Sequence, residues 1–433
     1  MVGKVMRSVT AGVLVVIVAA CTGSSLAPAE PSSTPGEARV PTGSAAPPPA
    51  ADGSIYFAAD AAGGDALSEP FGLGEAEIHP KPMDIYLSRR GQPIRRIIAT
   101  GAHERCPAVS PDGARMAYLK GPTIVIAPLD AEGSPGAPEV RVDLKAQGLY
   151  RPDEYRPGLS TGGACPQWSP DGRRLGYLVV IGDPHRITYS RFVPVTAEVH
   201  AVALGGRDRT LAAFDVGVWE SPQFAWSPDG HEVAFTTADG VWRAPLHGGA
   251  RELVWRSPRG NLGLKQPMDY DRPVSVAWSS RDELAFSVRR FIPTEPHNPM
   301  SGGKERFTVV VVDAGSGRVL LEAAGSAGEG GAGEQWSPDG SRLVFTGSHG
   351  YSRLYTRTRG STVRLALPLE GTDGGYAPTW SPDGQVLLAR ARSNDRGFVL
   401  ASFPLDGSSG EERTPWTWAL DWAGRDDVEW SSR

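Results

Sequence analysis

Beyond residue 53 the chain repeatedly alternates apolar and polar residues at every second position. The alternation is clearest in Arg115–Leu119, Glu232–Thr236, Glu283–Ser287 and Arg342–Thr346. Such alternation predicts short β-strands that bury one face. With 53 Gly and 38 Pro among 433 residues, few stretches without helix breakers are long enough for a helix. The pattern therefore predicts an all-β protein.

A turn motif stands before most of these strands and reads Trp-Ser-Pro-Asp-Gly in its full form. Pro presets φ for a type I turn, Asp accepts hydrogen bonds from turn amides, and Gly takes the left-handed position that follows. Equivalent positions are Val109, Trp168, Trp226, Trp278, Trp336, Trp380 and Trp422, with spacings of 59, 58, 52, 58, 44 and 42 residues. Strand-rich repeats with periods of about 40 to 60 residues are typical of β-propeller blades.

The repeats predict four-stranded antiparallel blades. The chain begins out of phase, because Ser54–Phe57, Asp84–Leu87 and Arg95–Ile98 have the character of second, third and fourth strands. The missing first strand is expected from Trp418–Trp422, so that N- and C-terminal strands share a blade and close the ring. We therefore expect seven blades, with six as the alternative if the last repeat is not a strand. Val428–Trp430 is a second candidate for the strand position assigned to Ser54–Phe57.

The Trp-Ser-Pro-Asp-Gly repeat resembles that of the TolB-like propeller family over residues 53–433. The resemblance implies a β-propeller. It implies no single activity, because the family includes translocation factors, sensors and the lids of peptidases. The sequence departs from the family motif at Val109, at Ser279-Ser280-Arg281-Asp282 and at Ala423-Gly424-Arg425.

The N-terminus has the pattern of a bacterial export signal. Lys4 and Arg7 precede the apolar segment Val9–Ala20, and Val18-Ala19-Ala20-Cys21 resembles a lipobox. We expect a signal peptide over residues 1–20 and lipidation of Cys21. Residues 21–52 then form a Pro/Ala/Ser-rich tether, with an upper reach of about 90 Å at ~3.1 Å per residue. The expected location is the cell membrane, lipid-anchored, on its extracytoplasmic face.

Charge and motif content exclude several function classes. The formal net charge is -5 and no run of Lys or Arg stands out, so nucleic acid is not an expected partner. The eight His residues lack metal-ligand spacing, and no Gly-x-Ser-x-Gly pentapeptide is present. The repeated Asp residues are explained by the turns. We expect no cofactor, no metal and a monomeric propeller, and we assign no catalytic residue.

Five long insertions are predicted to lie on one rim of the propeller, at residues 59–83, 144–164, 181–196, 256–273 and 289–306. The opposite rim is built of tight turns. Long loops are uncommon unless they carry function, and Tyr and Arg dominate interaction hot spots. The candidate contact residues on this rim are Tyr150, Arg151, Tyr155, Arg156, Tyr270, Arg272, Phe291 and His297.

The favoured function is a binding or scaffolding module for a protein, peptide or cell-wall glycan. The alternative is a hydrolase or lyase that uses carboxylates at the mouth of the propeller channel. Cys106 and Cys165 occupy the same position in successive repeats. Export favours a disulfide between them, whereas a separation beyond ~4.4 to 6.8 Å between their Cα atoms would leave two buried thiols.

Overall fold

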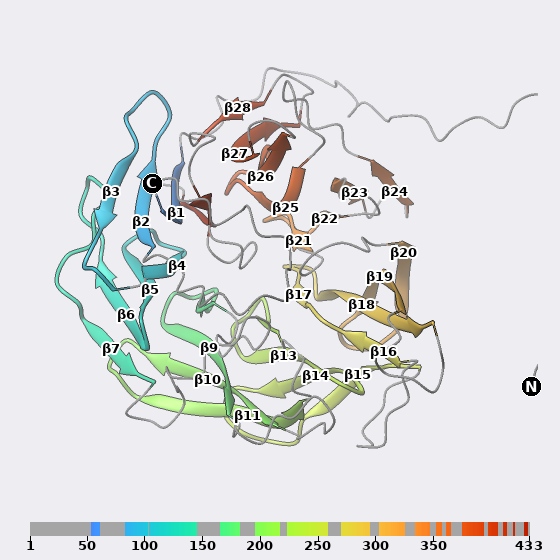
Figure 1. Ribbon diagram of the computed structural model, residues 1–433. Helices are drawn as coiled ribbons and strands as arrows, with labels where there is room; N and C mark the ends of the chain where they lie inside the picture. Colours follow the sequence, from blue (N-terminus) through green and yellow to red (C-terminus); the bar gives the residue numbers. More distant parts are fainter. Residues whose placement is uncertain are drawn as a thin grey trace, which may run out of the picture. The chain divides into compact units, whose positions relative to one another are not determined.

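The computed structural model describes sixteen segments of the chain, all of which belong to β-sheets or their turns. They are residues 53–60, 83–102, 104–144, 165–181, 195–216, 223–258, 270–294, 303–324, 334–346, 352–356, 361–364, 375–393, 397–405, 410–413, 419–420 and 428–431. Within them the strands form seven separate antiparallel sheets. This confirms an all-β, seven-bladed β-propeller (Figure 1).

Six blades follow one another along the chain. Blade 1 contains β4 (Glu104–Val109), β5 (Arg115–Lys120), β6 (Thr123–Pro128) and β7 (Val140–Asp143). Blade 2 contains β8 (Gln167–Trp168), β9 (Arg174–Ile181), β10 (Val195–Ala203) and β11 (Asp208–Val216). Blade 3 contains β12 (Phe224–Trp226), β13 (Glu232–Thr237), β14 (Gly240–Pro245) and β15 (Glu252–Arg256).

The next three blades repeat this order from the inner strand outward. Blade 4 contains β16 (Tyr270–Pro273), β17 (Ala277–Trp278), β18 (Glu283–Pro293), β19 (Gly303–Asp313) and β20 (Val319–Ala324). Blade 5 contains β21 (Gln335–Trp336), β22 (Arg342–Thr346), β23 (Ser352–Thr356) and β24 (Ser361–Arg364). Blade 6 contains β25 (Gly375–Trp380), β26 (Val386–Ser393), β27 (Gly397–Pro404) and β28 (Glu411–Glu412).

Blade 7 is built from both ends of the described chain. It contains β1 (Ser54–Asp60), β2 (Asp84–Ser88) and β3 (Arg95–Ile98), together with β29 (Ala419–Leu420) and β30 (Val428–Ser431). β29 pairs with β1 at Ala59 and Asp60, and β30 pairs with it from Ser54 to Phe57. The segment Val428–Trp430 therefore pairs with Ser54–Phe57 instead of replacing it. Of the predicted strand at Trp418–Trp422, the structure describes Ala419 and Leu420, which form β29.

The prediction of four strands in every blade was wrong for blades 4 and 7, which have five. In blade 4, β16 and β17 both pair with β18, at Val288–Phe291 and at Leu284–Ala285 respectively. The split has a plain cause: β18 has eleven residues, whereas the inner strand β17 has two. The remaining edge of β18 is available to a second short strand.

The predicted insertion at residues 289–306 was also partly wrong. Residues 289–293 continue β18 and residues 303–306 begin β19, and the two strands pair from Glu283↔Asp313 to Pro293↔Gly303. Strand pairing therefore extends this hairpin beyond Glu283–Ser287, the segment in which the sequence alternates. The other insertions, and the hairpin tip at residues 295–302, lie mainly outside the described residues.

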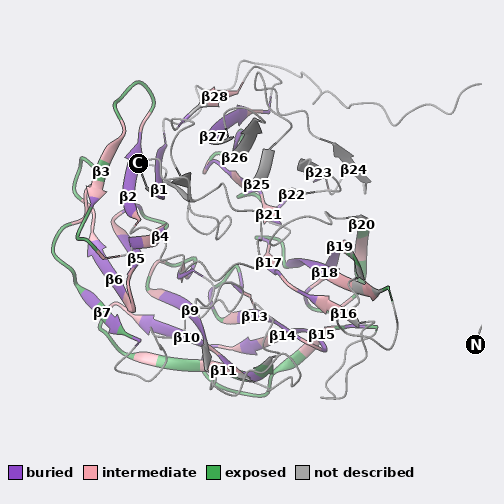
Figure 2. Cartoon of the chain, in the orientation of Figure 1, coloured by how far each residue is buried: buried purple, intermediate pink, exposed green. Residues whose placement is uncertain are grey.

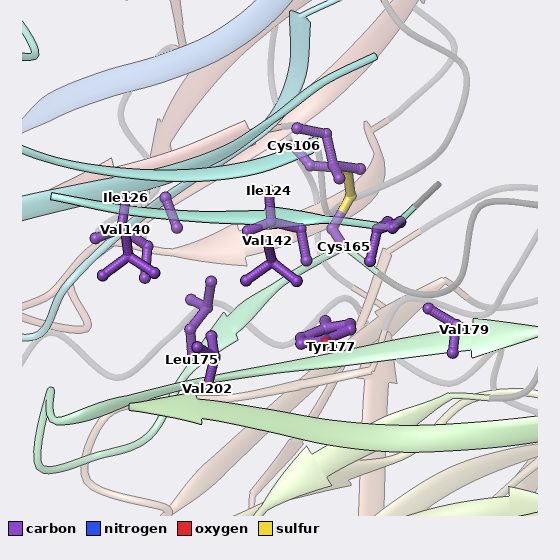
Figure 3. Close-up of a cluster of buried hydrophobic side chains, with 13 residues drawn as sticks. Cys106, Ile124, Ile126, Val140, Val142, Cys165, Leu175, Tyr177, Val179 and Val202 are labelled. Atoms are coloured by element: carbon purple, nitrogen blue, oxygen red, sulfur yellow. A yellow bond between two sulfur atoms is a disulfide. The ribbon is translucent and has the colours of Figure 1, made fainter. Parts of the chain in front are cut away.

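The hydrophobic core lies between neighbouring blades. Each blade packs an apolar face on the next, so that seven of the eight core clusters combine side chains of two adjacent blades. Figure 2 shows the strands β5, β6 and β13 as mostly buried, and β11 with several exposed positions. Between blades 1 and 2, Ile126, Val140 and Leu175 pack with Tyr177 (Figure 3). Sheet-on-sheet burial therefore holds the blades together.

Among the described residues, no helix has the length and apolar character needed to cross a membrane.

Candidate functional site

A cavity of ≈ 550 Å³ is lined by the inner strands of blades 1 to 6. Its wall consists of short segments around each motif position, from Pro107–Pro111 in blade 1 to Thr379–Pro382 in blade 6. Because the segments run into the first residues of the Ser-Pro-Asp-Gly turns, the cavity extends toward the rim that carries those turns. This rim is opposite the one on which the long insertions are predicted.

Tryptophans dominate the cavity wall, and most of their indole groups tie neighbouring blades together. Each of three indole nitrogens donates to the carbonyl that precedes the motif position in the previous blade. The pairs are Trp168 to Ala108 at 2.9 Å, Trp226 to Gln167 at 3.1 Å and Trp380 to Gln335 at 2.9 Å. These N–H groups are satisfied by backbone, so the tryptophans offer the cavity mainly ring surface.

The indole pattern changes in blades 4 and 5. Trp278 Nε1 donates to Asp282 Oδ1 at 2.9 Å, within its own turn. Trp336 Nε1 is buried and has no hydrogen-bond partner among the residues that the structure describes. Asp282 stands where the other turns have Gly, and its φ of 62° matches theirs, which lie between 66° and 70°. Asp is one of the few side chains that adopt this left-handed conformation readily.

The repeated turn aspartates are held by their own turns. Ser337 Oγ donates to Asp339 Oδ1 at 2.6 Å, and the Ser341 amide donates to the same oxygen at 3.1 Å. Hydrogen bonds from Ser337 and Ser341 lower the pKa of Asp339 to about 2. The Ser–Asp contact recurs at 110/112, 169/171, 227/229 and 381/383. These carboxylates stabilise hairpins, and they do not form a catalytic ring.

Glu334 supplies the carboxylate of the cavity wall. Its side chain is 0% exposed, Ser275 Oγ donates to Oε2 at 2.5 Å, and Ser287 Oγ donates to Oε1. Both serines belong to blade 4, so Glu334 bridges blades 4 and 5. Equivalent positions, two residues before the motif tryptophan, hold Pro166, Phe224, Val276 and Pro378.

Two amide side chains in the wall also contact the neighbouring blade. Gln167 Nε2 donates to Phe224 O at 3.3 Å, and Thr379 Oγ1 donates to Gln335 Oε1 at 2.8 Å. The sequence reasoning missed Gln167, Gln335 and Glu334. The available signal was the Gln residue just before two of the motif tryptophans, at positions that the repeat places on the innermost strand.

A titratable cluster lies away from the cavity, on the outer strands of blade 2. His200 Nε2 lies 2.9 Å from Glu198 Oε2, and Tyr177 Oη donates to Asp208 Oδ2 at 2.6 Å. Burial lowers the pKa of His200, but the carboxylates of Asp208 and Glu198 outweigh burial, so the pKa is raised. The His200 and Tyr177 rings stack at 5.0 Å. The four side chains form a polar network within the blade.

The structure does not test whether the predicted contact residues bind a partner, and it places only three of them. Tyr150, Arg151, Tyr155, Arg156 and His297 lie outside the described residues. The backbones of Tyr270 and Phe291 are register partners in β16 and β18, and Arg272 is the register partner of Arg289 two pairs along. Arg272 is half-buried. The lipidation candidate Cys21 also falls outside the part of the chain that the structure describes.

Cys106 and Cys165 are joined by a disulfide between blades 1 and 2 (Figure 3). Their Cα atoms are 5.4 Å apart, within the ~4.4 to 6.8 Å that a disulfide spans. β4 is irregular between Arg105 and Ala108, and Cys106 adopts a φ of 56° there. The bond therefore links the inner strand β4 of blade 1 to the residues just before β8 of blade 2, next to the cavity, since Cys165 also lines its wall.

No group of three or more His, Cys, Asp or Glu side chains among the described residues has the arrangement of a metal site. The described lining of the cavity offers indole rings, prolines, the hydroxyl groups of Ser110, Thr379 and Ser381, two engaged amides and one engaged carboxylate.

Comparison with solved structures identifies distant β-propellers. TolB from Acinetobacter baumannii is 14% identical, with a TM-score of 0.41 over 89% of this chain and 68% of that chain. Oligogalacturonate lyase in complex with manganese is 14% identical, with a TM-score of 0.50 over 75% and 83%. The puromycin hydrolase S511A mutant is 13% identical, with a TM-score of 0.48 over 77% and 50%.

No family model and no curated protein sequence matches the chain. At these identities the structural likeness supports the propeller fold alone.

Proposed function

We propose that this protein is a propeller that binds an uncharged segment of a peptide or glycan in its axial cavity. The chain is held at the extracytoplasmic face of the membrane by a lipid on Cys21. The shared blade 7 closes the ring and keeps the cavity in shape. The observation that carries the proposal is the chemistry of the cavity wall.

The wall favours binding over catalysis. Its lining residues include one ionisable group, Glu334, apart from the disulfide-bonded Cys165. Both oxygens of Glu334 accept hydrogen bonds from serines of the adjacent blade. General acid–base catalysis needs a group that exchanges a proton with the substrate, and usually a second group of opposite role. Glu334 is enclosed, and the described residues place no second titratable side chain apart from the disulfide-bonded Cys165 on this wall.

The size and surface of the cavity suit a ligand that stacks on aromatic rings. A volume of ≈ 550 Å³ falls within the roughly 300 to 1,000 Å³ typical of small-molecule sites. Trp168, Trp278 and Trp336 are half-buried and line the wall. The lining residues that the structure describes include no Lys or Arg, so this part of the wall gives no charge complement for an anionic ligand. Proline-containing peptides and the C–H faces of sugars dock on surfaces of this kind.

The rival function is a hydrolase or lyase acting at the channel mouth. The fold similarity to oligogalacturonate lyase, at a TM-score of 0.50, makes that class worth testing. It requires ionisable groups beyond those of the described wall. A lyase acting on uronates would also need cationic side chains to accept the substrate carboxylates.

The test compares two Gln→Trp variants of the full chain. Gln335→Trp fills the cavity, whereas Gln92→Trp places the same side chain on an exposed turn of blade 7. Each chain is crosslinked to its partner in the membranes that contain it. We expect Gln335→Trp to reduce capture at least tenfold and Gln92→Trp to leave it unchanged. Equal capture by both variants would show that the partner does not bind in the cavity.

A further inference from the structure

In blade 4, β16, β18 and β19 form a three-stranded ribbon on the side of the sheet away from the tight turns. Among the described residues, β20 pairs with β19 from Thr308 onward, whereas β18 and β19 remain paired to Pro293↔Gly303. β16 covers the other edge of β18 from Val288 to Phe291. We call residues 270–273, 288–293 and 303–307 the blade-4 ribbon. The ribbon extends on the rim opposite the tight turns.

The blade-4 ribbon has a surplus of positive charge. It contains five basic side chains and two acidic ones, a surplus of three, in a chain with a formal net charge of -5. The basic residues are Arg272, Arg289, Arg290, Lys304 and Arg306, and the acidic residues are Asp271 and Glu305. Lys304 and Arg306 are exposed. Arg290 Nε lies 3.9 Å from Asp271 Oδ1, so one of the two acidic groups faces a basic group of the ribbon.

The basic side chains are accompanied by apolar ones. Lys304 is the register partner of Ile292, and Arg306 precedes Phe307 in β19. Ile292 and Phe307 are only partly buried. Exposed Arg256, at the end of β15, adds a further positive charge beside the ribbon, since Ser257 Oγ donates to Asp271 O at 2.5 Å. Basic residues interspersed with apolar and aromatic ones are characteristic of protein surfaces that rest on a bilayer.

We propose that the blade-4 ribbon docks the propeller on the anionic phosphate headgroups of a lipid bilayer. Lys304 and Arg306 contact headgroup phosphates, and the surrounding arginines add to the local positive potential. The choice of a bilayer rests on the proposed lipid anchor at Cys21, which keeps the ribbon within reach of that surface. A propeller docked in this way turns its Ser-Pro-Asp-Gly rim, and the cavity that extends toward it, away from the membrane.

The experiment removes the anchor and measures what the ribbon contributes. The full chain carrying Cys21→Ala is sedimented with vesicles of phosphatidylglycerol and, separately, of phosphatidylcholine. The ribbon variant adds Lys304→Glu and Arg306→Glu. The matched control adds Arg207→Glu and Arg318→Glu, two exposed arginines in turns on the opposite rim. Both pairs change the net charge by the same amount, and every chain has the same N-terminal segment.

We expect the Cys21→Ala chain to bind phosphatidylglycerol vesicles in preference to phosphatidylcholine, with binding weakened by salt. The ribbon variant should lose about tenfold or more in vesicle affinity, while the control should change less than about twofold. Equal losses for both variants would overturn the proposal, because net charge alone would then explain binding. Absence of a lipid preference would overturn it as well.

A third arm separates a bilayer from a soluble anionic polymer. Binding of soluble polygalacturonate that exceeds vesicle binding and is lost in the ribbon variant would assign the ribbon to a polysaccharide and overturn the membrane proposal. The anchor is tested independently by fatty-acid labelling of Cys21, and the cavity by the Gln335→Trp capture assay. A failure of the ribbon is thus distinguishable from a failure of either.

Discussion

Blade 5 packs against blade 6 on one side and against blade 4 on the other, and the two seams are held by different hydrogen bonds. Toward blade 6, Trp380 Nε1 donates to Gln335 O, and Arg342 Nη2 donates to Gly384 O at 2.6 Å. Toward blade 4, Trp336 Nε1 is without a partner among the described residues, and Glu334 accepts from two serines. One seam is joined by indole and backbone, and the other by a buried carboxylate.

The difference is accompanied by a local change of sequence. Where the other turns read Ser-Pro-Asp-Gly, blade 4 reads Ser279-Ser280-Arg281-Asp282. Arg281 Nε donates to Asp339 O at 2.9 Å and Ser280 Oγ donates to Pro338 O at 3.1 Å, so side chains of the altered turn hold the next turn. The altered motif keeps the hairpin but redirects its hydrogen bonds. The seam between blades 4 and 5 is also where a carboxylate enters the cavity wall.

The seam between blades 1 and 2 is held by a covalent bond, the disulfide. Removing this bond should reduce the free energy of unfolding more than any other change considered. Cys106 and Cys165 are 59 residues apart in sequence, and a crosslink over that distance restricts the unfolded chain strongly. We expect Cys106→Ala combined with Cys165→Ala to lower the free energy of unfolding by about 4 kcal/mol, measured by urea denaturation. Reducing agent should produce a similar loss in the unmutated chain.

Thiol titration provides the direct check on the disulfide. In a Cys21→Ala chain, denatured without reductant, we expect no reactive thiol. Two reactive thiols would contradict the disulfide and leave blades 1 and 2 joined by packing alone.

The second prediction concerns Asp282, the residue of the altered turn that stands where the regular turns have Gly. Its φ of 62° is unfavourable for most side chains by about 1 kcal/mol or more, and its carboxylate accepts the Trp278 indole. We expect Asp282→Ala to lower the free energy of unfolding by about 2 kcal/mol, through the conformation and the lost hydrogen bond together.

Two further substitutions at Asp282 separate these contributions in the same urea measurement. Asp282→Asn keeps an acceptor and tolerates the conformation, so it should be nearly neutral. Asp282→Gly restores the residue of the regular turns and loses only the acceptor, so it should fall between Asn and Ala. If Gly proved as destabilising as Ala, the backbone conformation would not be the cause.

Much of the fold could be predicted from the sequence because the repeat is local. The turn motif and the alternating residues after it located the second strand of each blade, such as Arg115–Leu119 within β5. The ribbon could not be predicted in this way. Arg289-Arg290-Phe291-Ile292 does not alternate, and its extended conformation depends on pairing with β16 and β19, which are distant in sequence. Strand pairing of this kind is a tertiary effect.

The candidate site was harder to predict than the fold. The cavity wall is composed of residues just before and after the motif tryptophans, and their role depends on six blades meeting at one axis. Nothing in the sequence around Glu334 or Gln335 indicates which blade lies opposite. The long insertions can be recognised from the sequence by their length, whereas the described cavity is formed by short strands. The meeting of these strands at one axis leaves no comparable pattern in the local sequence.

The smallest predicted effect tests whether the unpartnered indole distinguishes the seam between blades 4 and 5. Trp168 and Trp336 are both half-buried and line the same cavity, but only Trp168 donates its indole N–H, to Ala108 O at 2.9 Å. Replacing either by Phe removes the N–H and keeps an aromatic ring. In Trp168→Phe a hydrogen bond is lost, whereas in Trp336→Phe a desolvated donor disappears. We expect Trp168→Phe to lower the free energy of unfolding by about 1 kcal/mol more than Trp336→Phe, measured by urea denaturation. Equal losses would mean that the Trp336 N–H is satisfied in solution, and the two seams would then differ only in the buried contact of Glu334 with Ser275 and Ser287.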